Sequence, residues 1–389
     1  MTQSRAWAGL SGSARWCSST NDDEESMEHD MEHEIDEYDQ DNRGQPSYIF
    51  RTHFNCPQTM SWFPGHMKKA IRELEDRRLK QSHVIVELRD ARIPFSSANK
   101  DLDFILKGTN KPRMIVLNKC DLAFNTENPK ETKRLKRQIS DMIRSSNTNC
   151  TNVFFTQATS DGSESGLDPL IKEIAQALPT KFKMTPRVVL VVGIPNCGKS
   201  SIINAIRKIS FKDVLGKSTK VAGVGATPAF TREFAVFPIS QIPPIYVFDS
   251  PGIMIPRFVG DRASESALRL ALCGAIREEV ADPEVVSDYM LYLMNKMGRF
   301  EYTNITRPHR VSDDINEVLV GVDRFLKGRQ RKPKYRDASE PNVHNSARFL
   351  LRKFRNGDLG PMLLDEDFLS SDTKPLSNVK KSSLFQDDE

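Results

Sequence analysis

The chain has 389 residues, of which 38% are hydrophobic, and a formal net charge of +4. This length and composition are typical of a soluble globular protein with two compact domains and polar tails, and no apolar run approaches the roughly 20 residues that a membrane-spanning helix needs. The cysteines are scattered without a CxxC pair, which argues against a disulfide framework or a zinc site and favours reduced thiols in an intracellular protein.

The N-terminal region changes composition after residue 21. Residues 1–21 contain Arg5, Arg15 and several serines but no acidic residue. This composition predicts a mitochondrial transit peptide, with a disordered start as the alternative. The following residues, 22–55, begin with a densely acidic run. Such a run repels itself and has little apolar surface to bury, so we expect a disordered linker.

Apolar and amphipathic segments alternate in the next part of the chain, 56–258. Short apolar runs, mostly rich in β-branched residues, predict strands at 83–88, 113–117, 153–156, 187–192 and 245–249. Helical spacing is found at 67–80, 130–146 and 167–178. This alternation predicts an α/β fold with a doubly wound, mainly parallel sheet.

Strand-like runs largely disappear after residue 257. Helical spacing predicts helices at 264–276, 283–297, 314–326 and 345–354. We therefore expect a small all-α domain over 259–364. A polar composition predicts a disordered tail over 365–389.

The run G-I-P-N-C-G-K-S, Gly193–Ser200, follows a predicted strand and leads into a predicted helix. In that context the glycines let backbone N–H groups surround phosphates, Lys199 places its charge on the terminal phosphates, and the Ser200 hydroxyl binds Mg²⁺. The sequence therefore predicts a phosphate-binding loop of a nucleotide hydrolase. The residues expected to contact the nucleotide are Asn196, Cys197, Gly198, Lys199, Ser200 and Ser201.

A second motif, Asp249-Ser-Pro-Gly252, ends another predicted strand. We expect Asp249 to hold the Mg²⁺ hydration shell and the Gly252 N–H to sense the γ-phosphate. A mobile threonine that reaches Mg²⁺ in the GTP state is expected between these two motifs. The segment 223–233 offers Thr231, which we favour narrowly, and Thr227 as the alternative.

A third motif, Asn118-Lys119-Cys120-Asp121, also follows a predicted strand. A carboxylate at Asp121 accepts from N1–H and the amine of guanine but would face a lone pair of adenine, so the motif predicts GTP. The run Thr156–Thr159 could supply a backbone contact to the guanine oxygen at Gln157 and Ala158.

The base-recognition motif precedes the phosphate loop, the reverse of the order in ordinary GTPases. A doubly wound sheet binds its ligand at the carboxyl ends of its strands, so circular permutation preserves the site while changing what is attached to it. Here the segment 223–260 leads directly into the predicted helical domain. We therefore expect nucleotide state to be transmitted to that domain.

The motifs in this order resemble the circularly permuted GTPases of the YlqF/RbgA family. The resemblance covers about residues 55–362 and is carried by SWFPGHMKKA (Ser61–Ala70), LRDARIPFSSAN (Leu88–Asn99), NKCD, GIPNCGKSS and DSPG, and by the C-terminal segment Asn345–Gly360. It implies a permuted GTPase domain followed by a helical domain. It also implies a role in assembling the large ribosomal subunit, with GTP hydrolysis marking a completed step.

The resemblance also implies roles for individual residues. Asn196 matches an asparagine that helps hold K⁺ against the phosphates. Ile253 stands where many GTPases carry a water-orienting glutamine, and His66 of the WFPGHM motif is the family's candidate for that task, with a structural role as the alternative. The family's Pro-Gly-x-Thr switch sequence does not align cleanly with 223–233, so the switch threonine stays open.

Basic residues with interleaved aromatic residues lie between 327 and 355. Such a run can neutralise phosphates and stack on unpaired bases. A solvated helix face is the alternative, but in a GTPase of this kind we expect ribosomal RNA. The basic residues are Lys327, Arg329, Arg331, Lys332, Lys334, Arg336, Arg348, Arg352, Lys353 and Arg355.

The motifs predict a monomeric GTP hydrolase that uses Mg²⁺. Together with the transit-like start, the resemblance implies use of K⁺, assembly of the mitochondrial large ribosomal subunit and contact with its rRNA. We expect it in the mitochondrial matrix, free or peripheral to the inner membrane. Two alternatives stay open: a nucleotide-gated RNA-docking protein in which hydrolysis is incidental, and a regulatory switch for targeting, which the absence of lipidation motifs disfavours.

Overall fold

The computed structural model describes residues 50–56, 71–147, 149–158, 165–179, 186–210, 235–241, 244–253, 263–328 and 340–369. The chain divides into two units, Met1–Phe50 and Arg51–Glu389, and the described helices and strands all lie in the second. None of the described helices is long and apolar enough to cross a membrane.

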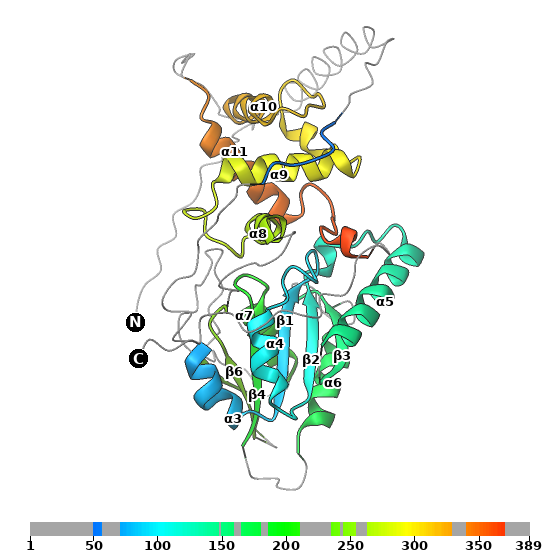
Figure 1. Ribbon diagram of the computed structural model, residues 1–389, viewed down its shortest axis with the longest axis vertical. Helices are drawn as coiled ribbons and strands as arrows, with labels where there is room; N and C mark the ends of the chain where they lie inside the picture. Colours follow the sequence, from blue (N-terminus) through cyan, green and yellow to red (C-terminus); the bar gives the residue numbers. More distant parts are fainter. Residues whose placement is uncertain are drawn as a thin grey trace, which may run out of the picture. The chain divides into compact units, whose positions relative to one another are not determined.

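Six strands form one sheet in the order β3-β2-β1-β4-β6-β5 (Figure 1). Their bounds are β1 Val84–Asp90, β2 Arg113–Asn118, β3 Cys150–Thr156, β4 Arg187–Gly193, β5 Ala235–Gln241 and β6 Pro244–Asp249. All neighbours pair in parallel except β5, which is antiparallel to β6. The predicted mainly parallel sheet is confirmed, and the five parallel strands end at one edge.

The strand β5 is not among the predicted strands. It contains Pro238, which cannot donate to a ladder hydrogen bond and interrupts the strand pattern. The structure accommodates Pro238 because β5 is the edge strand and the pairing with β6 shifts register between Pro238 and Ser240. A proline at that place is tolerated on an edge and would not be in the middle of the sheet.

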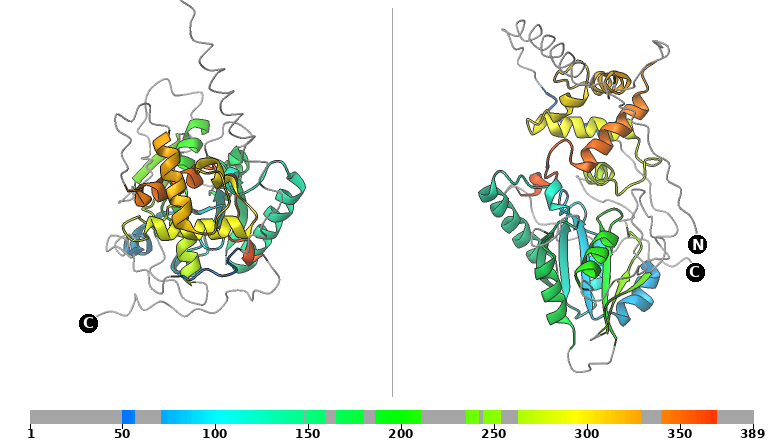
Figure 2. Two further views of the ribbon diagram at one scale, coloured as in Figure 1. Left: turned by 90° about the horizontal axis from the view of Figure 1, so that it is seen from above. Right: turned by 180° about the vertical axis from the view of Figure 1, so that it is seen from behind.

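Helices cover both faces of the sheet. One face carries α6 (Leu167–Ala177) and α7 (Lys199–Ser210), the latter in green in the view from behind (Figure 2). The other carries the π-helical turn η1 (Leu74–Arg78) with α3 (Leu79–Gln81), α4 (Lys100–Lys107) and α5 (Pro129–Ser146). Alternation along β1 explains this division, because Val84, Val86 and Leu88 join one hydrophobic cluster while Ile85 joins another.

The helical region after residue 262 contains α8 (Ala263–Leu272), α9 (Pro283–Lys296), α10 (Ile315–Gly328) and α11 (Val343–Asn356), so the four predicted helices are confirmed (Figure 1). Short 3₁₀ turns, η2 (Cys120–Leu122), η4 (Glu301–Ile305) and η5 (Glu366–Phe368), lie between or after the larger elements. One hydrophobic cluster contains Val86 of the sheet together with Leu268, Met290 and Leu350 of the helices. The helical region therefore shares a core with the sheet.

The last residues of the predicted linker pack on the helical region. The ring of Phe54 lies 5.1 Å from that of Tyr289 and 5.7 Å from that of Tyr292, centroid to centroid. Arg51 pairs with Asp288 on α9 at 2.7 Å. The prediction of a disordered linker is therefore wrong for residues 51–55, where an aromatic anchor and an ion pair follow the acidic run.

The packed part of the chain also extends beyond the predicted end at residue 364. Asp365 is fully buried, and the ring of Phe368 stacks on that of Phe95 at 5.5 Å. Residues 365–369 therefore belong to the folded region rather than to the predicted tail. Residues 1–49 and 370–389 lie outside the described residues, and the other domain boundaries stay predictions.

Candidate nucleotide-binding site

The phosphate loop connects the end of β4 to α7, as predicted. Asn196 and Gly198 have positive φ angles of 58° and 95°, and Lys199 is the first residue of α7. The Lys199 ammonium is buried and donates to the carbonyls of Gly193 and Ile194 at 3.2 and 2.9 Å. A tight loop of this kind at a helix N-terminus is suited to binding phosphate through backbone N–H groups.

Position 198 requires glycine because the side chain of Asn118, in the base-recognition motif, lies directly against it. A Cβ atom at Gly198 would collide with the side-chain amide of Asn118. That amide nitrogen donates to the carbonyl of Cys197 at 3.0 Å. The two motifs, far apart in the sequence, are thus joined by a direct hydrogen bond.

Asn118 also binds the loop after β3. Its Oδ1 accepts from the Thr156 hydroxyl and from the Ala158 N–H, each at 3.2 Å. The Gln157 N–H donates to the Ser165 carbonyl at 2.9 Å. Asn118 therefore holds three strand-end loops together, and the predicted guanine contacts of Gln157 and Ala158 stay predictions.

The remaining residues of the base-recognition motif differ in exposure. Lys119 has φ of 66° and donates from Nζ to the Asn196 carbonyl at 2.5 Å and to Asp90 Oδ2 at 3.0 Å. Asp121 is exposed. The Cys120 thiol donates to the Leu117 carbonyl at 3.3 Å, and burial raises its pKa to about 12. Asp121 is thus available to a base, whereas the Cys120 side chain faces its own strand.

Two predicted magnesium-binding side chains lie together at the ends of β6 and the phosphate loop. The Ser200 hydroxyl donates to Asp249 Oδ2 at 3.1 Å. The other oxygen, Oδ1, is buried and has no hydrogen-bond partner among the described residues. Burial raises the pKa of Asp249, and Lys199 and Ser200 counteract that effect. A buried carboxylate oxygen beside a hydroxyl fits the oxygen ligands that Mg²⁺ prefers.

The turn after β6 lies against the phosphate loop. The Ile253 N–H donates to the Gly193 carbonyl at 3.1 Å, and a Cβ atom at Gly252 would come within 2.7 Å of Pro195. Ile253 itself is only 2% exposed and packs in the hydrophobic cluster that contains Ile85 of β1. Asn99 Nδ2 donates to the Ile253 carbonyl at 3.3 Å. The Ile253 side chain is therefore directed into the core and not toward a nucleotide.

The phosphate loop also touches the helical region directly. Asn196 Nδ2 donates to the carbonyl of Gly274 at 2.7 Å, just after α8. Gly274 has φ of 78° and packs beside Arg355 of α11. Because its amide nitrogen is a donor, the Asn196 side chain can contact the predicted K⁺ only through its Oδ1.

Some predicted site residues lie outside the described residues: His66, Thr227 and Thr231. Ser201 lies in the first turn of α7. The sequence analysis included Asp90 and Asn99 only as members of the motif Leu88–Asn99, and it did not find the loop contacts of Asn118. The sequence signal for Asp90 and Asn118 is a polar residue at the end of a strand, whereas Asn99 lies directly before α4.

The basic residues of α11 are largely engaged within the helical region. Arg348 and Arg355 both pair with Glu278, at 2.8 and 3.2 Å, and Lys353 pairs with Asp358 at 3.0 Å. Arg352 is exposed and lies over the ring of Phe349. The predicted basic surface is thus reduced on this helix, and residues 329–339 lie outside the described part.

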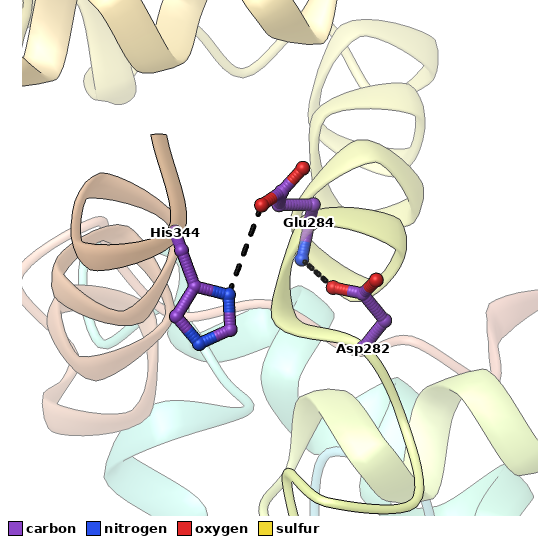
Figure 3. A group of neighbouring side chains, drawn as sticks. All are labelled: Asp282, Glu284 and His344. Atoms are coloured by element: carbon purple, nitrogen blue, oxygen red, sulfur yellow. Dashed lines mark hydrogen bonds and ion pairs between the residues drawn. The ribbon is translucent and has the colours of Figure 1, made fainter. Parts of the chain in front are cut away.

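One group of potential metal ligands occurs among the described residues, Asp282, Glu284 and His344 (Figure 3). Asp282 caps α9 by accepting from the Glu284 N–H at 2.9 Å, and Glu284 lies 3.7 Å from His344 Nδ1. Both acids lie at the N-terminus of α9, where negative charge offsets the helix dipole. Helix capping therefore accounts for Asp282, and the helix dipole favours Glu284.

Comparison with known proteins agrees with this geometry. A family model described as a 50S ribosome-binding GTPase matches residues 188–317. The chain is therefore a GTPase, an enzyme class that binds GTP typically together with Mg²⁺.

Full-length relatives extend the comparison beyond that segment. Mitochondrial GTPase 1 of Aedes aegypti is 32% identical over 82% of this chain and 99% of its own length. Mitochondrial ribosome-associated GTPase 1 is 33% identical in Mus musculus, over 79% of this chain and 90% of its own, and 32% identical in Xenopus tropicalis, over 82% and 99%. The chain belongs to the mitochondrial ribosome-associated GTPase 1 family.

Proposed function

We propose that this GTPase binds the maturing large ribosomal subunit in the mitochondrial matrix, contacts its rRNA, and hydrolyses GTP to mark a completed assembly step and release itself. The names of its relatives, which are described as mitochondrial and ribosome-associated, support this proposal. So does the match to a ribosome-binding GTPase model. We expect a monomer, free in the matrix or peripheral to the inner membrane.

The observation that carries the proposal is the bond between Asn196 and Gly274. A phosphate loop that is bonded to the helical region can transmit the state of the nucleotide to that region without an intermediate element. Ribosome binding by the helical region and hydrolysis at the sheet would then influence one another. This reciprocity is what an assembly GTPase needs in order to hydrolyse GTP only on its correct partner.

In the proposed site, Asp121 recognises guanine, the backbone of the phosphate loop and Lys199 bind the phosphates, and Ser200 and Asp249 hold Mg²⁺. The metal neutralises charge on the β- and γ-phosphates when it is bound. Because Ile253 is buried, water must be oriented by another group, for which we propose His66. Thr231, or Thr227 instead, is the proposed switch residue, and the Asn196 oxygen the proposed K⁺ ligand.

The proposal is tested by GTP turnover of the full chain in K⁺ or Na⁺ buffer, with and without purified mitochondrial large subunits. Strong stimulation that needs both subunits and K⁺ is expected. His66→Ala should lower the stimulated rate by about 100-fold, the scale of a lost proton-transfer or water-orienting group. His53→Ala removes an exposed histidine elsewhere and serves as the matched control.

Equal and slow turnover in every condition would contradict the proposal.

Ile253 favours a second candidate function, because a buried apolar side chain at this position supplies no water-orienting group. In that candidate the protein is a nucleotide-gated RNA-docking factor whose hydrolysis is incidental. It predicts that His66→Ala leaves ribosome assembly normal even though turnover is lost.

A further inference from the structure

Asp90, the last residue of β1, lies buried between two cationic side chains. Its Oδ1 accepts from the N–H and the Nε of Arg92 at 3.1 and 2.9 Å. Its Oδ2 accepts from Arg92 Nη2 at 2.8 Å and from Lys119 Nζ at 3.0 Å. Asp90 is only 1% exposed, which limits competition from water at its carboxylate, while the Lys119 side chain is partly exposed.

This carboxylate is held in its charged form. Burial alone would raise the pKa of Asp90, but Arg92 and Lys119 outweigh burial and lower the pKa well below its usual range. Hydrogen bonds between charged groups are about twice as strong as neutral ones. Asp90 is therefore a fixed anion directly beside the base-recognition loop.

The partner of Asp90 bridges two nucleotide loops. The Lys119 backbone belongs to the base-recognition motif, whereas its ammonium binds the carbonyl of Asn196 in the phosphate loop. An unrestrained lysine side chain samples many rotamers, and fixing it upon ligand binding costs free energy. Asp90 supplies a second bond to the same ammonium and thereby holds the bridge in place.

Arg92 connects Asp90 to the helical region. Its guanidinium lies 5.6 Å from the centre of the Phe354 ring of α11, and its carbonyl accepts from the Leu364 N–H at 2.8 Å. The guanidinium is bidentate to the carboxylate, which fixes the plane of the carboxylate as well as its position. The anion that holds Lys119 is thus itself held by the helical region.

We propose that Asp90 is a positioning residue of the nucleotide site, whose carboxylate holds the Lys119 ammonium against the phosphate loop so that the base-recognition loop is preformed for a guanine nucleotide. The inference rests on the proposed nucleotide site. Asp90 acts on nucleotide affinity through Lys119 and touches no reacting atom. The loss of its charge should therefore affect GTP and GDP alike.

Asp90→Asn keeps the size of the side chain but removes its charge. We expect the Kd of both GTP and GDP to rise by about tenfold or more, the scale of one lost hydrogen bond to a charged group. In turnover, the change should appear mainly in KM, because an interaction present equally in the bound and transition states contributes to binding. Affinities are measured by titration of the full chain with fluorescent GTP and GDP analogues.

Glu87→Gln is the matched control. Glu87 lies on the same strand, is equally buried, and is also paired with two cations, Arg89 and Arg113, but neither belongs to a nucleotide loop. Both variants lose a buried carboxylate and should lower the thermal unfolding temperature. Only Asp90→Asn should weaken nucleotide binding, and an equal weakening by Glu87→Gln would overturn the proposal.

A double-mutant cycle with Lys119→Met tests the route of the effect. If Asp90 acts through Lys119, adding Asp90→Asn to Lys119→Met should change Kd by less than about twofold, whereas independent effects would multiply. A full tenfold loss in that background overturns the inference. If Lys119→Met itself leaves the affinity unchanged, Lys119 does not contribute to binding and the inference is overturned, whereas the proposed nucleotide site fails only if the wild-type chain binds neither GTP nor GDP.

Folding is checked by circular dichroism at the temperature of the titration. If Asp90→Asn is not folded, Asp90→Glu replaces it, because this variant keeps the charge but displaces the carboxylate. It is expected to lose affinity in the wild-type background and not in Lys119→Met. Unchanged affinity of folded Asp90→Glu in both backgrounds would contradict the proposal.

Discussion

Polar residues have different roles at the carboxyl edge of the sheet and on α11. At the sheet edge, Asn118 and Lys119 bond to residues of other loops, and these bonds bring the sequence motifs together. On α11, Arg348 and Arg355 bond to Glu278 of the same helical region. The spaced motifs of the sequence therefore predicted where the site lies, whereas the run of basic residues did not predict how many of them are already paired within the protein.

The largest effect is expected from a substitution in the phosphate loop at the sheet edge. Lys199→Ala removes the ammonium that the phosphate loop encloses, and kcat for GTP hydrolysis should fall by about 100-fold or more, as for other preorganised charge-stabilising donors. Lys208→Ala, at an exposed position in the same helix, is the matched control and should leave turnover unchanged. Near-normal turnover of Lys199→Ala would show that phosphate is bound elsewhere.

A second prediction concerns Glu87 in the middle of β1, whose carboxylate contributes to stability and not to nucleotide binding. Burial would raise the pKa of Glu87, but Arg113 and Arg89 outweigh burial and lower the pKa to about 2 from 4.5. Since the folded-state value is depressed, Glu87 stabilises the protein above its unfolded-state pKa, and this stability is lost as pH falls toward 2. Its contribution is at most about 3 kcal/mol.

Urea unfolding at pH 5 and pH 3 measures this contribution. The free energy of unfolding should fall more steeply with decreasing pH in the wild type than in Glu87→Gln, which has no carboxylate to protonate. Parallel losses in the two proteins would mean that the ion pairs of Glu87 do not stabilise the fold. Asp103 also pairs with Arg113, and burial together with the charge of Glu87 raises the pKa of Asp103, so its titration changes in Glu87→Gln. The comparison is therefore made with Asp103→Asn present in both proteins.

Sequence reasoning found five strands, four C-terminal helices and the convergence of the motifs, because each depends on local periodicity or on the rule that ligands bind at strand ends. It missed β5, where an edge position tolerates Pro238, and α4, which has only eight residues. The packing of Phe54 on Tyr289 was likewise not predictable, since it joins residues distant in the chain. Asp90 was noticed as part of a motif, but its bond to Lys119 is visible only in three dimensions.

The smallest effects on stability are expected on α11, where two arginines differ in their contacts. Arg355 donates to the carbonyls of Leu272 and Ala271 at 3.1 and 3.0 Å and pairs with Glu278. Arg355→Ala leaves those groups without a partner and should lower the free energy of unfolding by about 2 kcal/mol. Arg352→Ala removes an exposed side chain and should change it by less than about 0.5 kcal/mol.

Binding to an rRNA fragment should rank the two variants in the opposite order. Arg352 is free to face phosphate, so Arg352→Ala should weaken binding a few-fold and lower the dependence of log K on log salt by about one charge. Folded Arg355→Ala should retain that dependence, because its charge is already paired with Glu278. If both variants weaken RNA binding equally without loss of stability, the ion pair with Glu278 does not withdraw Arg355 from the RNA surface, and charge on α11 acts as a whole.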